Sequence, residues 1–259
     1  MKLWPRLKYL TRGAVIIASL PAVGVAAQLT QTDNESETVL ISPIIAEEVL
    51  PTPPQEFELR VGTDYRERDA KANGALPYAE ANFGLVDRLG GSLNIEAAYH
   101  RQNETAYGFG DVSLSLKYLA VPYTQTVPAI VFGLQTQFPS EDQHLGLGTG
   151  AYELNPFIGL LKAFDTVIVQ GNVGWLKQVT HAHESACSYD LSAAVPVYQR
   201  KFYLLIETSG QAGRRNQATI APGVKYLFPK KFSAGIATPI GLTNDTEAWG
   251  IFTQFEFQF

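Results

Sequence analysis

The chain ends in the stretch Trp249-Gly250-Ile251-Phe252-Thr253-Gln254-Phe255-Glu256-Phe257-Gln258-Phe259. Its odd positions carry five large apolar side chains and Thr253, and its even positions are mostly glycine, glutamine and glutamate. Successive side chains of a β-strand point to opposite faces. The alternation therefore predicts a strand with one apolar and one polar face.

The same period of two recurs through most of the chain before this last strand. We expect twelve strands, at residues 56–64, 76–86, 92–101, 109–119, 128–139, 151–161, 165–176, 188–197, 201–208, 217–228, 231–240 and 248–259. Several of them contain a proline, which removes a ladder donor and favours a bulge or a strand end there. These prolines include Pro156, Pro196, Pro222 and Pro239.

The connections between these strands alternate in length. Those after even-numbered strands are mostly short, such as 87–91 and 162–164, whereas those after odd-numbered strands are longer, such as 65–75 and 140–150. Short turns at one end and long loops at the other are typical of outer-membrane barrels. The sequence therefore predicts an all-β fold, a transmembrane antiparallel up-and-down β-barrel of about 12 strands.

Composition agrees with a barrel. Apolar residues make up 46% of the chain and charged residues only 17%, compared with a usual ~25% charged. A soluble β-sandwich is the competing fold, but it needs no apolar face on every strand and no aromatic girdle at the strand ends. The candidate girdle residues are Tyr65, Tyr118, Phe138, Trp175, Phe228 and Phe232.

The N-terminal region divides into two parts. Residues 1–27 combine a basic front, an apolar core and the small residues Val25-Ala26-Ala27, which predicts a secretory signal peptide cleaved before Gln28. Residues 28–55 hold five acidic and no basic residues and end in Pro51-Thr52-Pro53-Pro54, which predicts an acidic, proline-rich periplasmic linker. The barrel then occupies residues 56–259.

The charge of the mature chain excludes one class of partner. Cleavage removes four of the 20 basic residues and none of the 25 acidic ones, leaving a net charge of −9. Nucleic acid needs a basic footprint, so it is not an expected partner.

The polar faces of the strands define the residues expected to line the lumen. They are Glu58, Arg60, Glu80, Glu96, Asp111, Lys117, Glu153, Asp190, Glu207, Lys225 and Glu256. Eight are acidic and three basic, so an open pore would prefer cations or neutral solutes to anions. The other possibility is a closed lumen filled by paired side chains.

Two resemblances add to this interpretation. The alternate aromatics Phe255, Phe257 and Phe259 at the end of the last strand resemble the recognition signal of the bacterial barrel-assembly machinery. The stretch 107–118, with Gly108-Phe109-Gly110-Asp111 and Leu116-Lys117-Tyr118, resembles a strand of the family named for the "MetA-pathway of phenol degradation".

The family resemblance covers residues 56–259. It continues through residues 128–139, the glycine-rich loop 146–150, Leu205-Ile206-Glu207 and residues 221–226. It implies a Gram-negative outer-membrane barrel, in contact with membrane lipid and lipopolysaccharide, that passes small and often hydrophobic compounds.

The expected function is thus a narrow, non-enzymatic channel for a small, hydrophobic or aromatic solute, without cofactor or metal. A membrane-embedded hydrolase, similar to the twelve-stranded phospholipases, is one alternative. It needs a serine within reach of an oriented histidine, and no local pattern around the four histidines provides one. A structural or adhesive barrel is another.

His181, His183 and Cys187 share one predicted loop, but three residues without a fourth ligand are a weak metal signal.

Overall fold

The computed structural model is all-β. It describes residues 41–68, 71–101, 105–139, 147–180, 184–213, 216–229 and 231–259, which belong to one compact unit, Thr38–Phe259. The expected signal peptide lies outside these residues. Within the described part, no helix is long and apolar enough to cross a membrane.

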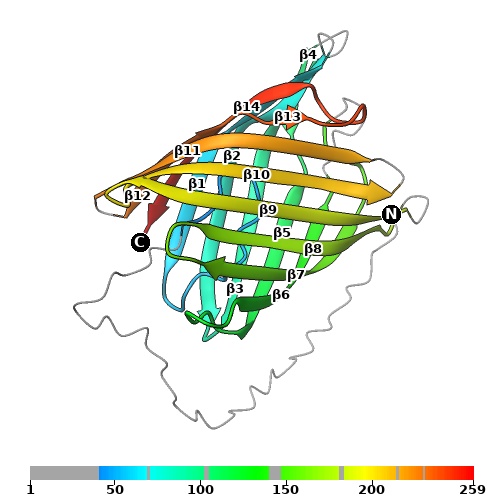
Figure 1. Cartoon of the computed structure of the whole chain (residues 1–259). Helices are drawn as coiled ribbons and strands as arrows, with labels where there is room; N and C mark the ends of the chain where they lie inside the picture. Colours follow the sequence, from blue (N-terminus) through cyan, green and yellow to red (C-terminus); the bar gives the residue numbers. More distant parts are fainter. Residues whose placement is uncertain are drawn as a thin grey trace, which may run out of the picture. The chain divides into compact units, whose positions relative to one another are not determined.

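In the described ranges, fourteen strands form a single antiparallel sheet (Figure 1). They are β1 (Phe57–Arg68), β2 (Lys71–Val86), β3 (Leu89–Arg101), β4 (Thr105–Phe109), β5 (Val112–Val121), β6 (Ala129–Phe138), β7 (Glu153–Ala163), β8 (Ile168–Gln178), β9 (Ser185–Tyr198), β10 (Phe202–Gly213), β11 (Gln217–Phe228), β12 (Phe232–Ala237), β13 (Ile240–Gly241) and β14 (Trp249–Gln258).

The sheet closes on itself, which confirms the predicted barrel. β14 pairs with β1 from Glu58 opposite Gln258 to Glu67 opposite Trp249. β4 and β5 both pair with β3, and β12 and β13 both pair with β11 and β14, so each couple acts as one interrupted strand. The wall is therefore a closed ring of twelve strands, in which the last strand pairs with the first, and this removes the sandwich alternative.

The two interruptions lie at Gly110-Asp111 and at Thr238-Pro239. Pro239 has no N–H for the ladder, so the break beside it has a simple cause. The strands on either side of several expected loops are longer than predicted. β1 and β2 leave only residues 69–70 between them, and β10 runs to Gly213. The expected loops 65–75 and 209–216 are therefore mostly strand, because cross-strand hydrogen bonding continues past the end of the apolar pattern.

Side chains alternate between the two faces of the wall. Leu204 and Ile206 are about half exposed, whereas Leu205 between them is 4% exposed. Large exposed apolar side chains follow this rule around the ring and form the outer face that lipid would contact. Among them are Leu93, Ile95, Leu114, Leu116, Phe132, Ile158, Val173, Trp175, Val195 and Ile251.

We name the two ends of the barrel by their connections. The turn end carries the short connections 87–88, 164–167, 199–201 and 229–231, and the loop end carries the longer connections 139–152 and 242–248.

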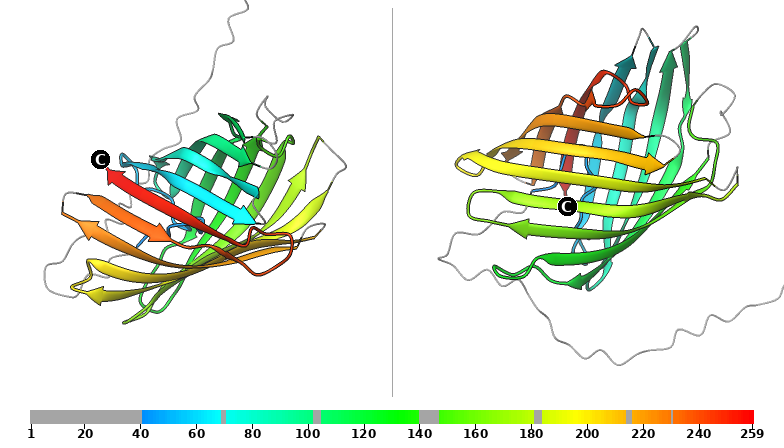
Figure 2. Two further views of the ribbon diagram at one scale, coloured as in Figure 1. Left: turned by 90° about the horizontal axis from the view of Figure 1, so that it is seen from above. Right: turned by 45° about the vertical axis from the view of Figure 1, so that its right-hand side comes forward.

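The hydrophobic core lies inside the barrel, near the turn end. It forms where residues 41–50, called the inner segment below, pack against the wall. Ile41 and Ile44 contact the inner faces of β7 to β12, and Val49 contacts those of β6 and β7. The inner segment thus packs against most of the ring from within. Figure 2 shows the inner segment enclosed by the strands.

The region predicted as an acidic, proline-rich periplasmic linker, residues 28–55, thus includes a segment that packs against the inner face of the wall. Within that region, the inner segment is buried or half-buried at every position, with Val49 at 0% exposure. Its apolar residues match an apolar ring on the inner face of the turn end, which explains why it docks. The ring includes Ala129, Val131, Leu161, Ala163, Ile168, Ala194, Leu205 and Ala221.

Candidate channel lumen

Side chains of the wall bind the inner segment mainly through the backbone atoms of the segment. The Glu207 carboxylate on β10 accepts hydrogen bonds from the N–H groups of Ile44, Ile45 and Ala46, at 2.8, 2.6 and 2.8 Å. Gln170 on β8 accepts from the Val49 N–H and donates to the Ile41 carbonyl, so one amide holds both ends of the segment. These contacts give the buried backbone the partners that it would otherwise lack.

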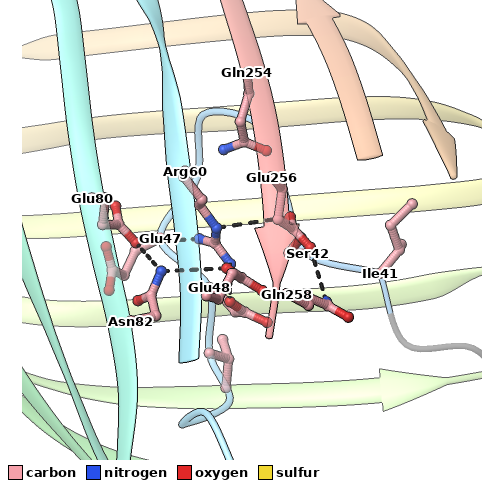
Figure 3. Close-up of polar contacts among 12 residues, drawn as sticks. Ile41, Ser42, Glu47, Glu48, Arg60, Glu80, Asn82, Gln254, Glu256 and Gln258 are labelled. Carbon is pink, nitrogen blue, oxygen red and sulfur yellow. Dashed lines mark hydrogen bonds and ion pairs between the residues drawn. The ribbon is translucent and has the colours of Figure 1, made fainter. Parts of the chain in front are cut away.

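A charged network joins the inner segment to β1, β2 and β14 (Figure 3). The Arg60 guanidinium contacts carboxylate oxygens of Glu48, Glu58 at 2.5 Å and Glu80 at 3.4 Å. Asn82 donates to Glu80 at 2.7 Å. Because Arg60 is buried, these carboxylates supply the opposite charge that it requires.

The two lysines of the inner face also bind the inner segment. Lys117 on β5 contacts the Glu47 carboxylate at 2.6 Å and donates to the Glu48 carbonyl at 2.6 Å. Lys225 on β11 donates to the Ser42 hydroxyl at 2.6 Å and to Glu256 at 2.8 Å. Both ammonium groups are almost completely buried, so the segment provides part of their solvation.

At the loop end, Asp111 fixes the loop between β6 and β7. Its carboxylate accepts from the Thr149 N–H at 2.6 Å, the Thr149 hydroxyl at 2.9 Å and the Gln137 amide at 2.7 Å. Gly148 adopts φ +81°, and a Cβ there would lie 2.1 Å from Asp111 Oδ1. A Cβ on Gly110 would lie 2.3 Å from Glu96 Cγ. The glycines and aspartate of the 108–111 motif and loop 146–150 therefore allow this loop to fold against the wall.

A cavity of about 360 Å³ lies on the inner face of the loop end. Its lining includes Asp64, Arg66, Glu96 and Glu247 from the wall and Leu147 from the β6–β7 loop. Asp64 holds Arg66 through two contacts of 2.9 Å, so the positive charge of Arg66 is already paired. Glu96 and Glu247 thus leave the cavity with an excess of negative charge.

The structure places all eleven predicted lumen residues on the inner face, but in two groups. Glu58, Arg60, Glu80, Lys117, Glu207, Lys225 and Glu256 surround the inner segment at the turn end. Glu96, Asp111 and Glu153 lie toward the loop end, and Asp190 in β9 lies between the two groups, near Glu47 and Glu207. Of these four, Asp111 accepts a hydrogen bond from Thr149 in the β6–β7 loop, and Glu153 accepts one from Gln178 at 2.7 Å.

Sequence reasoning missed the partners of these residues. Ser42, Glu47 and Glu48 fell within the expected linker, and the neutral Gln170 and Gln254 were not singled out. One signal was present: the stretch Ile41 to Leu50 has six apolar residues among ten, which is too apolar for a solvated acidic linker.

The terminal aromatics lie on the outer face. Phe255, Phe257 and Phe259 are all exposed, and Phe232 lies near two of them, with ring centroids 6.4 Å from Phe255 and 5.0 Å from Phe257. Phe259 contacts Phe57 across the closing strand pair, at 5.8 Å. They form an aromatic patch at the turn end.

The metal and hydrolase alternatives gain no support from the described residues. His144, His181 and His183 lie outside them, Cys187 is half-buried in β9, and His100 lines a loop-end pocket with Arg68 and Asn73. In the described ranges, no group of three or more His, Cys, Asp or Glu side chains is arranged to hold a metal ion.

Comparison with known proteins agrees with this architecture. The family model described as "Putative MetA-pathway of phenol degradation" matches residues 55–259, so the chain belongs to that family, as its motifs indicate. No curated protein sequence matches the chain.

Several solved structures of outer-membrane proteins share the fold. The COG4313 outer membrane channel from Pseudomonas putida F1 superposes with a TM-score of 0.62 at 11% identity, over 85% of this chain and 100% of that one. The NanC porin gives a TM-score of 0.55 at 13% identity, over 76% and 97% of the two chains. The KdgM porin gives 0.52 at 8% identity, over 79% and 98%. At these identities the likeness establishes the fold alone, a closed antiparallel β-barrel.

Proposed function

We propose that this protein is a non-enzymatic outer-membrane channel for the passive passage of small neutral or cationic solutes. The observation that carries the proposal is the negative excess of the loop-end cavity, whose lining holds the three carboxylates of Asp64, Glu96 and Glu247 and one basic side chain, Arg66. A low-dielectric wall strengthens the field of such charges on a passing ion. The resemblance in fold to a channel and to porins supports the same function.

The proposal includes the cellular setting. After removal of residues 1–27, the barrel would lie in the outer membrane of a Gram-negative bacterium, in contact with lipid and lipopolysaccharide. Phe255, Phe257 and Phe259 would serve the barrel-assembly machinery as the recognition signal. The family's name directs the choice of solutes toward phenol and related aromatic compounds.

Liposome swelling tests the function directly. Purified barrel in liposomes is challenged with small solutes of similar size, one neutral, one cationic and one anionic, together with phenol. We expect faster swelling with neutral and cationic solutes than with the anionic solute. Absence of swelling with every solute, or fastest swelling with the anion, would contradict the proposal.

A lipid-hydrolysis assay on the same liposomes separates the channel from the hydrolase alternative. The channel predicts no release of fatty acid above that of empty liposomes. A structural or adhesive barrel predicts neither hydrolysis nor solute-specific swelling.

A further inference from the structure

The inner segment places its charge in the part of the lumen where all three predicted inner-face cations lie. Lys117 contacts Glu47, Arg60 contacts Glu48, and Lys225 donates to the Ser42 hydroxyl and carbonyl. We propose that the inner segment is a selectivity element: it masks these wall cations and makes the lumen more negative. This inference rests on the proposed channel function and assigns a role to a segment that the channel fold does not itself explain.

The charges on the two sides of the contact give the direction of the effect. Among the charged wall side chains with a hydrogen bond or ion pair to the segment or to Arg60, three are basic and four are acidic, a net charge of −1. The segment contributes two carboxylates and no basic residue, so the net charge of these wall groups and the docked segment together is −3. The counted wall groups are Arg60, Lys117, Lys225, Glu58, Glu80, Glu207 and Glu256.

The segment can lose its charge without losing its position. Its backbone is held by three bonds to Glu207 and two to Gln170, and the Gln254 amide donates to the Ile44 carbonyl at 3.3 Å. Ile44 and Val49 add buried apolar contacts on opposite parts of the wall. None of these contacts uses the carboxylates of Glu47 or Glu48. Neutral glutamine in their place retains a hydrogen-bond acceptor for Lys117 and Arg60.

The double variant Glu47→Gln, Glu48→Gln therefore tests the inference in the full chain. In planar bilayers under a KCl gradient, we expect its potassium-to-chloride permeability ratio to fall by about two- to fivefold relative to the wild type, because two fixed negative charges leave the lumen. The matched control Glu56→Gln removes one exposed carboxylate just before β1 and should leave the ratio unchanged. An unchanged ratio in the double variant overturns the inference.

Removal of residues 41–50 gives a second, stronger perturbation. The shortened chain should conduct more current and select less for potassium than the double variant does. A synthetic peptide of residues 38–50, added to the turn end, should restore both properties. A peptide with both glutamates replaced by glutamine should reduce the current without restoring the selectivity. Equal selectivity with the two peptides would contradict a role for the carboxylates.

A measurement without current separates this inference from the channel proposal. An anionic amine-reactive reagent should modify Lys117 about threefold or more faster in the double variant than in the wild type, since the carboxylate of Glu47 that contacts this lysine is gone. Mass spectrometry gives the rates, with exposed Lys201 as the internal reference. If no protein conducts but this difference is present, the channel function fails while the masking of the cations stands. Equal rates overturn the masking.

Discussion

Replacement of Glu207 by glutamine should release the inner segment from the wall. One carboxylate of 2% exposure accepts three backbone hydrogen bonds, two of them on Oε2. A hydrogen bond to a charged group contributes about 1.5–3 kcal/mol net. Glutamine keeps a single acceptor oxygen, and the three bonds share one group. We therefore expect a loss of about 2–4 kcal/mol of docking free energy, a roughly 30- to 700-fold rise in the open fraction.

Cysteine labelling measures this opening. Ala46→Cys places a thiol in the buried segment, and Cys187→Ser removes the chain's single native cysteine. When the segment opens and closes quickly relative to labelling, the labelling rate follows the open fraction. The Glu207→Gln variant should label faster by the factor given above, in detergent as well as in liposomes.

A matched control is Glu153→Gln. Glu153 is also a buried inner-face carboxylate, but its partner is Gln178 at the loop end, so its loss should leave the labelling of the inner segment unchanged. A Glu207→Gln rate within a factor of about three of the parent would refute the idea that this carboxylate holds the segment.

Four further predictions concern other parts of the chain. Gly110→Ala brings a methyl group 2.3 Å from Glu96 Cγ, so the free energy of unfolding in guanidinium should fall by about 1–3 kcal/mol; an unchanged midpoint would contradict the close packing. Asp111→Asn replaces a charged acceptor of Thr149, so limited proteolysis within residues 139–152 should become faster than in the wild type. Equal cleavage rates would show that Asp111 does not fix the loop. The mature protein from outer membranes should begin at Gln28, and deletion of Phe259 should lower the amount of folded barrel. N-terminal sequencing and the heat-dependent shift on gels test these two expectations, and retention of residues 1–27 or an unchanged yield would refute them.

The strands of the wall can be predicted from the sequence. Successive side chains of a strand face opposite sides, and the side that faces lipid is apolar, so apolar residues recur at every second position. Leu204, Leu205 and Ile206 illustrate the limit of that rule: all three are apolar, yet Leu205 points inward against Ile44 rather than toward lipid. The apolar inner positions at the turn end, such as Leu205, pack against the inner segment. The pattern alone does not show this, since a buried apolar face looks the same whatever covers it.

The inner segment itself was not predictable as a wall partner. The segment belongs to no strand, so its apolar residues follow no regular spacing. Most of its polar contacts use backbone atoms, which any residue would supply. The charges of the lumen were predictable one by one, since Glu207 and Lys225 stand on polar faces of strands. Their partners were not, because Ser42 lies 183 residues from Lys225 in the chain. Pairing at that separation depends on closure of the whole ring.

The reversal potential of the wild-type barrel tests the central claim most directly. Purified protein in a planar bilayer with a tenfold KCl gradient should open a small conductance whose reversal potential lies on the potassium side. The acidic loop-end cavity and the docked inner segment both act in that direction. A reversal potential at zero or on the chloride side, in a barrel shown to be folded by its heat-dependent gel shift, would contradict a lumen governed by these carboxylates.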